Sequence, residues 1–326
     1  MTASIRFGIV GCGRHGERYL RHLRRGDVPG ATATALWRRD AAAAALLAER
    51  YQVRAVADWV ELIGDASVDA VIVTTPPGAH AGPIRAAVAA GKPVLTEKPL
   101  TETLASALDL AAALPADAPV MVAQTLRWSP ALLAARGRMP EIGEVHRIRL
   151  AQRLEPNAIL WQRDQAMAGA GSVTLTGVHV FDLLRWFAGA TPERVSARCR
   201  TLLGHPFENL FDARFEFADR PLLGSCEVGK FSASRSQLLE LVGTGGQLWV
   251  DYQQGRVELL HGAGRRLIAA PGDQPTLPPA LTDFCRFVRG EIPCPVPLSA
   301  GVETLRMADA CYRSDAADGA LVRLDQ

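Results

Sequence analysis

Three glycines near the start of the chain have the spacing of a phosphate-binding turn. Gly11, Gly13 and Gly16 form G-x-G-x-x-G between an apolar run and a run with helical periodicity. The first glycine permits a tight bend, the second lets a pyrophosphate approach the backbone, and the third lets helix and strand pack closely. The N–H groups at the start of the following helix favour an anion. The pattern predicts a dinucleotide site that includes Arg14 and His15.

The end of the second predicted strand indicates which dinucleotide binds. NAD sites carry an acidic residue there for the ribose 2′-hydroxyl, whereas this strand ends Trp37-Arg38-Arg39. Two guanidinium groups can bind a 2′-phosphate, which a carboxylate would repel. We therefore predict cofactor contacts at Trp37, Arg38 and Arg39 and favour NADP. NAD stays open, because both arginines can be solvated and Asp40 can reach a ribose.

A lysine follows the fifth predicted strand, at the edge where open α/β sheets bind ligands. Glu97-Lys98-Pro99 comes directly after Val94–Thr96. Partial burial and a neighbouring cation lower the pKa of a lysine, and its charge polarises a substrate oxygen. This position predicts Lys98 near a nicotinamide, although Lys-Pro after a strand is also frequent in ordinary loops.

The first part of the chain must form the sheet that positions these groups. Apolar runs alternate with helical patterns from Ile5 to Gln124, which is typical of a parallel sheet built from βαβ units. The predicted strands are Ile5–Val10, Thr32–Trp37, Val53–Ala57, Ala70–Thr74, Val94–Thr96 and Val120–Gln124. The predicted helices are Gly16–Arg25, Ala41–Tyr51, Trp59–Ile63, His80–Ala90 and Leu104–Leu114.

The alternation changes after Gln124, where strands follow one another without helices between them. This pattern predicts an α+β domain with a mostly antiparallel sheet. The predicted strands are Glu144–Leu154, Arg194–Leu203, Leu210–Phe217, Leu222–Val228, Gln237–Val242, Gln247–Asp251 and Val257–Leu260, and the helices are Pro130–Arg138, Val173–Phe187, Ala280–Val288 and Ala300–Ala317. The fold class is thus α/β, with a Rossmann domain at residues 1–126 and an α+β domain at residues 127–326.

Composition limits the partners. The 326 residues, 48% of them hydrophobic, can bury two domain cores, and 36 basic against 34 acidic residues leave no field for nucleic acid or an anionic membrane. The longest uncharged stretch, Gln165–Phe181, is shorter than the roughly 20 residues that span a bilayer. A strand at Ile5 leaves no room for a signal peptide, which predicts a cytoplasmic protein. The six scattered cysteines predict reduced thiols and no metal site.

Further motifs carry a resemblance to a known family. They occur in the family's order along nearly the whole chain and are Thr75-Pro76-Pro77-Gly78-Ala79-His80, Gly91-Lys92-Pro93-Val94-Leu95-Thr96-Glu97-Lys98-Pro99, Arg127-Trp128-Ser129-Pro130, Ile142-Gly143-Glu144-Val145, Gly177-Val178-His179-Val180-Phe181-Asp182 and Ala310-Cys311-Tyr312-Arg313-Ser314. With the glycine turn, they resemble the Gfo/Idh/MocA family of glucose-fructose oxidoreductase, inositol dehydrogenase and rhizopine-catabolism proteins.

The resemblance implies an NAD(P)-dependent oxidoreductase that acts on a carbinol or carbonyl carbon of a sugar, polyol or related small molecule. It implies a homodimer or homotetramer that packs through the C-terminal sheet. Lys98, whose bond to Pro99 is often cis in relatives, resembles the lysine that binds the reacting oxygen, and His179 resembles the acid/base residue. Glu97 and His80 resemble neighbours of the nicotinamide ribose. Further cofactor contacts are predicted at Thr75, Pro76, Gln124 and Arg127.

Removal of a hydride from a carbinol needs a base for the hydroxyl proton, and a histidine suits that task. His179 is the candidate, although a core histidine on an apolar helix is the alternative. Many relatives have an aspartate four residues earlier, where this chain has Leu175. Asp182 could orient His179 instead, or only tether its helix, and Thr174 or Thr176 could relay a proton. His179 alone, Lys98 as main proton donor, and loss of turnover all stay open.

Trp128, Trp161 and Asp182 are candidate substrate contacts. Two of the aromatic or charged positions are open between two roles. Arg127 and Trp128 either bind substrate or fasten the junction of the two domains, and Trp161 lies in a loop with candidate specificity residues. Two functions compete on these residues: an NADP-dependent dehydrogenase or reductase, and a non-catalytic dinucleotide-binding regulatory protein of the same family. The loss of the aspartate at Leu175 motivates the second. The sequence does not choose the substrate, because loops shape the pocket.

Overall fold

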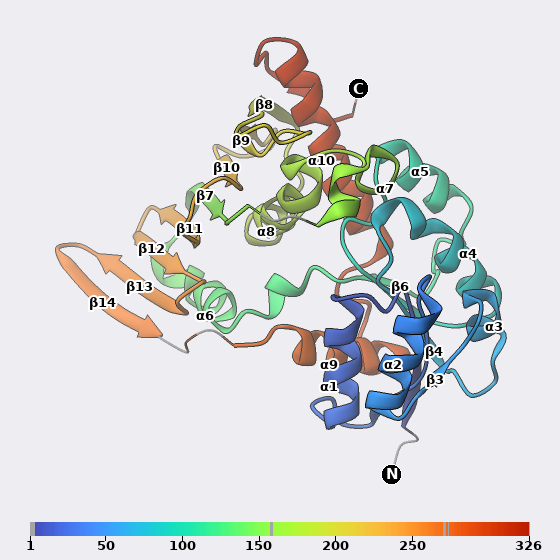
Figure 1. The fold of residues 1–326 in the computed structure, drawn as a ribbon. Coiled ribbons are helices and arrows are strands. Elements are labelled where there is room, and N and C mark those ends of the chain that lie inside the picture. Colours follow the sequence, from blue (N-terminus) through green and yellow to red (C-terminus); the bar gives the residue numbers. More distant parts are fainter. Residues whose placement is uncertain (1–3, 157–158, 270–271, 273, 326) are drawn as a thin grey trace. The chain divides into compact units, whose positions relative to one another are not determined.

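The computed structural model describes residues 4–156, 159–269, 272 and 274–325. The chain divides into two compact units (Figure 1). The first runs to Gln124 and includes Leu277–Val302, and the second consists of Thr125–Thr276 and the chain from Glu303 onward. The chain first passes from one unit to the other after Gln124, two residues before the predicted boundary at 126. The sequence analysis placed Leu277–Val302 with the second domain, but the structure places this segment with the first.

The first unit contains a six-stranded parallel sheet in the order β3-β2-β1-β4-β5-β6. Its strands are β1 (Ile5–Val10), β2 (Ala31–Trp37), β3 (Arg54–Ala55), β4 (Ala70–Val73), β5 (Val94–Thr96) and β6 (Val120–Val122). Its helices are α1 (Gly16–Arg25), α2 (Ala41–Tyr51), α3 (Trp59–Gly64), η1 (Pro77–Ala79), α4 (Ala81–Ala89), α5 (Leu104–Ala112) and α9 (Leu277–Val288). The predicted parallel sheet is confirmed, with most ends within two residues of their predicted places.

Helices cover both faces of this sheet. Phe7 of β1 packs against Phe284 of α9, with ring centroids 6.0 Å apart. The next residue, Gly8, faces the other side, where a Cβ would lie 2.4 Å from Leu62 of α3. Because successive strand residues point to opposite faces, α9 and α3 cover opposite sides of β1. The sheet needs α9 to bury Phe7, which explains why a segment from late in the chain returns to this unit.

The strand order reverses direction between β1 and β4, which defines the position of a ligand crevice. In open α/β sheets, ligands bind outside the carboxyl ends of the strands at this point. The glycine turn follows β1, and Thr74 and Thr75 follow β4. All four residues of β4 are buried, as its continuously apolar sequence predicted.

The second unit contains a nine-stranded sheet in the order β14-β13-β12-β11-β7-β10-β9-β8-β15. The strands are β7 (Val145–Arg153), β8 (Arg194–Arg200), β9 (Leu210–Glu216), β10 (Leu223–Gly229), β11 (Ser236–Gly243), β12 (Gly246–Asp251), β13 (Arg256–His261), β14 (Gly264–Ala269) and β15 (Val322–Arg323). Only the pair β7–β10 is parallel among the described ladders, so the mostly antiparallel sheet is confirmed. The sequence analysis missed β14, where four consecutive exposed residues show no alternation, and the two-residue β15.

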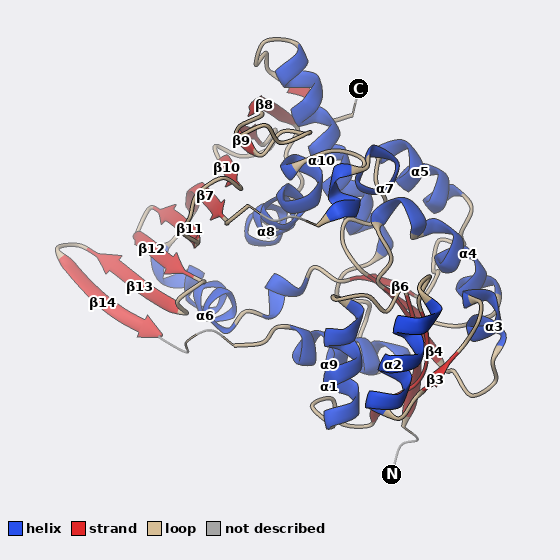
Figure 2. Ribbon diagram, in the orientation of Figure 1, coloured by secondary structure: helices blue, strands red, loops and turns tan. Residues whose placement is uncertain are grey.

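Helices cover one face of this sheet (Figure 2). They are α6 (Pro130–Arg138), α8 (Val178–Ala188) and α10 (Leu298–Ala316), of which α10 begins in the first unit. Phe181 of α8 packs against Phe211 and Phe215, with ring centroids 5.7 and 5.5 Å apart. On the other face, charged side chains pair across strands, as Arg153 and Glu227 do at 2.8 Å.

The helical run that ends in α8 differs from its prediction. It begins with α7 (Gln165–Ala168) and continues through the π-helix η5 (Val173–Gly177). The run Gln165–Ala188 has 24 residues and is, by length and composition, able to cross a membrane, which corrects the expectation from the shorter uncharged stretch. In the described chain, 78% of its apolar window is buried inside the protein, where α8 packs on β7 and β10 as a core helix.

Candidate functional site

The glycine turn has the geometry that its spacing predicts. Gly11 has φ +89°, and a Cβ on it would lie 2.5 Å from the backbone nitrogen of Thr75. A Cβ on Gly16 would lie 2.6 Å from the Oγ1 of Thr74. A Cβ on Gly13 would meet only the carbonyl oxygen of Gly11, at 3.9 Å. The first and third glycines thus let the turn pack against the end of β4, while the second leaves an open face.

The open face is lined by backbone donors. Helix α1 has no side-chain cap, and the amides of Arg14, His15 and Gly16 have no acceptor among the residues that the structure describes. Unpaired amides at a helix N-terminus, together with the helix dipole, bind phosphate groups. The turn therefore fits the pyrophosphate of a dinucleotide.

The end of β2 supports the turn and carries two free cations. The carbonyl of Trp37 accepts hydrogen bonds from the amides of Gly11 and Cys12, at 3.0 and 2.9 Å. Among the described residues, neither Arg38 nor Arg39 has an ion-pair partner. Asp40, the alternative ribose ligand, caps α2 instead by accepting from the amide of Ala43 at 3.0 Å. The positive charge beside the turn is therefore not neutralised by this carboxylate.

Lys98 lies in the turn that follows β5, and its bond to Pro99 is cis, as the resemblance implies. The side chain is half-buried. Burial lowers the pKa of Lys98, while the negative charge of Glu97 opposes that shift, and the pKa remains below its ordinary value. A lysine of this kind exchanges its proton more readily near neutral pH than a solvated lysine does.

Glu97 joins two turns of the first unit. It is 8% exposed, and its Oε1 lies 2.7 Å from His15 Nε2 and accepts the Tyr19 hydroxyl at 2.6 Å. Its Oε2 accepts the amide of Lys98 at 3.1 Å. Burial raises its pKa, but the charges and hydrogen bonds of His15, Lys98 and Tyr19 outweigh burial and hold the pKa well below the usual range. The carboxylate thus joins the glycine turn to the Lys98 turn, and its predicted place beside the nicotinamide ribose stays a prediction.

His80 is also occupied inside the protein. It is 0% exposed, and its ring nitrogens lie 2.7 Å from the carbonyl oxygen of Thr75 and 3.2 Å from that of Leu100. Burial lowers its pKa despite the opposing carbonyl groups. Both ring nitrogens thus face carbonyl groups of the chain, and the place of His80 beside the nicotinamide ribose stays a prediction. His80 instead ties the turn after β4 to the turn after β5.

The other predicted contacts of the first unit divide by burial. Thr75 and Pro76 are half-buried beside the glycine turn, and the Thr75 hydroxyl donates to the carbonyl of Ala79 at 3.1 Å. Gln124 is 1% exposed. A dinucleotide can reach Thr75 and Pro76 at the surface. The side chain of Gln124 is enclosed, and its contact with the cofactor stays a prediction.

In the second unit, Arg127 and Asp182 bind each other. The guanidinium donates to both carboxylate oxygens, at 2.8 and 2.6 Å, and the side chains are 16% and 2% exposed. This pair joins η2 (Thr125–Trp128) to α8. Asp182 therefore tethers its helix, and a contact with substrate stays a prediction. The pair also ties up the guanidinium of Arg127, which was predicted to contact the cofactor.

His179 is an accessible residue in an otherwise buried stretch of the chain. Between Gly171 and Leu184 every residue is buried except His179. A core histidine would be enclosed like its neighbours, so this exposure favours a functional role. Leu175 is 6% exposed. The turn between Leu175 and His179 is partly π-helical and therefore contains more residues than an α-turn, so four-residue spacing does not place these two side chains directly above one another.

The predicted aromatic contacts differ in exposure. Trp128 is 9% exposed and belongs to the interior, and its contact with substrate stays a prediction. Trp161 is half-buried in η4 (Leu160–Arg163) and stays a candidate.

The sequence analysis missed three residues that support the site. Tyr19 binds Glu97 in the first unit. Glu208 and Tyr312 bind each other at 2.8 Å in the second unit, beside the start of η5. Tyr312 belongs to the last recognised motif, and that motif was the one available signal.

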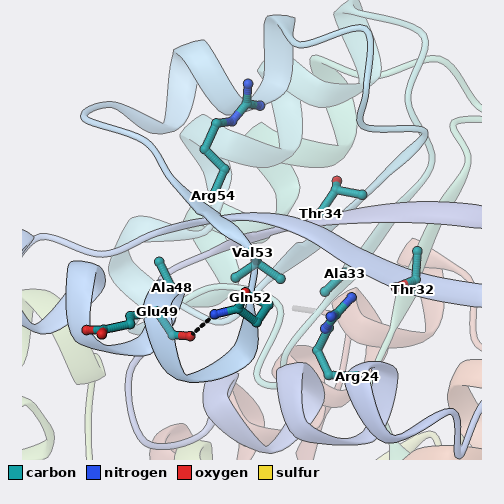
Figure 3. A pocket seen from close by; sticks show the side chains of 9 residues that line it. All are labelled: Arg24, Thr32, Ala33, Thr34, Ala48, Glu49, Gln52, Val53 and Arg54. Carbon is teal, nitrogen blue, oxygen red and sulfur yellow. Dashed lines mark hydrogen bonds between the residues drawn. The ribbon is translucent and has the colours of Figure 1, made fainter.

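A cavity of about 600 Å³ opens on the first unit (Figure 3). It does not include the glycine turn or Lys98. It is lined by Arg24, Thr32, Ala33, Thr34, Ala48, Glu49, Gln52, Val53 and Arg54. The threonines belong to the first half of β2, whereas Trp37 at its carboxyl end contacts the glycine turn. The cavity is therefore at the opposite edge of the sheet from the phosphate site.

Comparisons with known proteins agree with this geometry. A model of an oxidoreductase family with an NAD-binding Rossmann fold matches residues 5–123, and a Gfo/Idh/MocA C-terminal domain model matches residues 135–249. Inositol 2-dehydrogenase 2 of Saccharopolyspora erythraea is 33% identical over 218 residues, which are 66% of this chain and 62% of that protein. The match thus spans under two thirds of the relative's length.

Solved structures share the fold over the whole chain. A levoglucosan dehydrogenase complex with NADH and levoglucosan has a TM-score of 0.87 at 22% identity and covers 99% of this chain and 100% of its own. GenD2 from gentamicin A biosynthesis, in complex with NAD, has a TM-score of 0.84 at 27% identity and covers 99% of this chain and 97% of its own. Together, the two consecutive domain models, the sheet order and the glycine turn lead to one conclusion: the chain belongs to the Gfo/Idh/MocA oxidoreductase family.

Proposed function

We propose that the protein is an NAD(P)-dependent oxidoreductase that transfers a hydride between the nicotinamide and a carbinol or carbonyl carbon of a sugar, polyol or related small molecule. The observation that carries this proposal is Lys98, a half-buried lysine with a lowered pKa that Glu97 links to the glycine turn. A relative named as an inositol 2-dehydrogenase and a levoglucosan dehydrogenase of the same fold support the substrate class.

The chain's own residues divide the chemistry between binding and proton transfer. When bound, a nicotinamide supplies or accepts the hydride. The amides of Arg14, His15 and Gly16 hold the pyrophosphate against the open face of Gly13. The ammonium group of Lys98 binds the reacting oxygen and stabilises the negative charge that develops on it. His179 takes the hydroxyl proton during oxidation and returns it during reduction.

The decisive experiment follows nicotinamide absorbance with a panel of polyols, sugars and keto-sugars. Steady turnover with one of them, reduced strongly when Lys98 is replaced, supports the proposal. Binding of the dinucleotide without turnover on any compound contradicts it and supports the alternative, a non-catalytic regulatory protein. The buried Leu175, which stands where many relatives have an aspartate, is the observation that favours this second function.

Glu97→Gln shifts the pH dependence of turnover. Burial lowers the pKa of Lys98 and the Glu97 charge raises it, so removal of that charge lowers the pKa further. The ammonium form then disappears at a lower pH, and the alkaline limb of the kcat/KM profile moves toward acid. The pH profiles of the wild type and of Glu49→Gln provide the comparison, because Glu49 is an exposed residue of α2. An alkaline limb that does not move, or that moves to higher pH, contradicts this role.

We infer a preference for NADP over NAD from the end of β2. Arg38 and Arg39 have no ion-pair partner among the described residues, and Asp40 is occupied as a helix cap. Charge-assisted hydrogen bonds contribute about 1.5–3 kcal/mol each, so we expect Arg38→Ala to weaken NADP binding at least about tenfold and NAD binding little. Calorimetry with both dinucleotides measures this, with Arg24→Ala on α1 as control. Equal losses for NADP and NAD would exclude a 2′-phosphate contact.

Assembly and location stay predictions. The face of the second sheet that α6, α8 and α10 leave uncovered carries cross-strand ion pairs such as Arg149 and Glu240. We propose this face as the contact of a homodimer or homotetramer, and we retain the cytoplasmic location predicted from the sequence.

A further inference from the structure

Glu208 binds three consecutive residues, 171–173, where η5 begins. The π-helix η5 continues into α8, which carries His179. Its carboxylate accepts the amide of Gly171 at 3.2 Å and that of Val173 at 2.9 Å. Its backbone carbonyl accepts the amide of Ser172, also at 2.9 Å. These amides begin a helical segment and would otherwise lack acceptors within it. A carboxylate at this end is also favoured by the helix dipole.

The contact is close and its loop is braced. A Cβ on Gly171 would lie 2.1 Å from the carbonyl oxygen of Glu208, so this approach requires glycine. The next residue, Asn209, is 3% exposed, and its side chain accepts the amide of Leu202 at 2.8 Å and donates to the carbonyl of Leu202 at 3.1 Å. These bonds close the loop between β8 and β9. Glu208 is thereby held at the ordered end of this loop.

Tyr312 extends the same network from α10. Its hydroxyl donates to Glu208 Oε1 at 2.8 Å and lies 3.3 Å from Thr174 Oγ1. Because a phenol has a single hydrogen, which Glu208 receives, the Thr174 hydroxyl donates to Tyr312. Glu208 therefore connects, through its carboxylate, its backbone carbonyl or Tyr312, to each of residues 171–174. Residues 171 and 172 precede the π-turn, and residues 173 and 174 begin it. The turn ends at Gly177, and α8, which contains His179, follows directly.

We propose that Glu208, with Tyr312, is a positioning residue that sets the register of this π-turn and so the place of the His179 imidazole. The inference rests on the proposed function, because that function gives the position of the His179 imidazole its purpose. A π-turn inserts an extra residue into a helix and occurs frequently at functional sites. Its start must be held from outside, because the inserted residue disturbs the regular hydrogen-bond ladder. Misplacement of a reacting group by about 1 Å costs about a hundredfold in rate.

The test begins on the protein alone. We expect Glu208→Ala to raise amide hydrogen exchange of residues 171–179 at least about tenfold and to change the rate at which diethyl pyrocarbonate modifies His179, read by mass spectrometry. Glu208→Gln, which keeps an acceptor oxygen, should show a smaller effect. Glu216→Ala, which removes the half-buried carboxylate paired with Arg194, is the matched control and should change neither quantity. Unchanged exchange and modification in Glu208→Ala overturn the inference, whether or not a substrate is known.

Turnover then separates positioning from general stability. We expect Glu208→Ala to lower kcat about tenfold to a hundredfold with a much smaller change in KM. In a His179→Asn background the same substitution should have no further effect on kcat, because a residue that acts through His179 has nothing left to position. An equal loss in both backgrounds shows a merely structural role and overturns the inference. A wild type without turnover contradicts only the proposed function, and the modification rate of His179 then decides the inference.

Discussion

Lys98→Met is expected to lower kcat/KM about a thousandfold while dinucleotide affinity changes less than about threefold. Methionine has a similar length but neither charge nor proton, so the reacting oxygen loses its electrostatic partner. A positioned donor of this kind contributes about a hundredfold to ten-thousandfold to the rate. The variant should fold, because the amide of Lys98, not its ammonium group, accounts for the 3.1 Å bond to Glu97. Initial rates and calorimetric binding measure the two quantities.

Lys92 offers the matched control for this experiment. It lies in the same unit, and its ammonium group donates to the carbonyl of Asp65 at 2.6 Å, at the opposite end of β5 from Lys98. Lys92→Met should lower the melting temperature slightly and leave kcat/KM unchanged within about twofold, because a single hydrogen bond contributes about 1 kcal/mol to stability. Equal losses in both variants would show that the effect of Lys98 is structural. Full activity in Lys98→Met would remove lysine from the mechanism.

His179→Asn is expected to lower kcat about a hundredfold to ten-thousandfold, the usual contribution of a general acid or base. Asparagine keeps a polar side chain of similar size but cannot exchange a proton in the neutral range. The pH profile of kcat should lose the limb that reports this group. Because His179 is the only accessible residue between Gly171 and Leu184, the substitution should change the melting temperature little.

Thermal unfolding distinguishes the competing interpretation of His179 as a core residue. In that case His179→Asn would lower stability and leave the pH profile unchanged. His146→Asn is the control, because His146 is on β7 and binds the carbonyl of Pro221 at 3.1 Å, outside the α8 helix. A normal kcat in His179→Asn would contradict the acid/base role and strengthen Lys98 as the main proton donor.

Burial shows which of the recognised residues are bonded inside their own unit. Glu97, His80 and Asp182 belong to motifs that the sequence analysis recognised, but each is enclosed and bonded to another part of its own unit. Motif membership predicts that a residue matters and does not predict whether it touches a ligand or holds another residue that does. Two of their partners are distant in the sequence: His15 is 82 positions from Glu97, and Arg127 is 55 positions from Asp182. Thr75 is five positions from His80.

The sequence by itself determined the elements and the chemistry-bearing turns. G-x-G-x-x-G after an apolar strand requires its glycines for local reasons, and in the structure Gly11 and Gly16 lie against the end of β4. The parallel sheet followed from alternating apolar runs, because strands covered on both faces must be continuously apolar. Capping by Asp40 and the short turn at Lys98 are likewise local in origin.

Only the tertiary structure decided how distant segments hold the site. The return of α9 to the first sheet, the Arg127–Asp182 pair and the hold of Glu208 on residues 171–173 join parts of the chain that no periodicity connects. The π-turn before His179 also depends on distant segments. Nearly every residue around it is buried, so the sequence shows no single apolar stripe whose phase would reveal an extra residue. Contacts from the loop before β9 and from α10 fix this turn. Local physics thus set which residues could react, and long-range packing set where His179 and the residues around it stand.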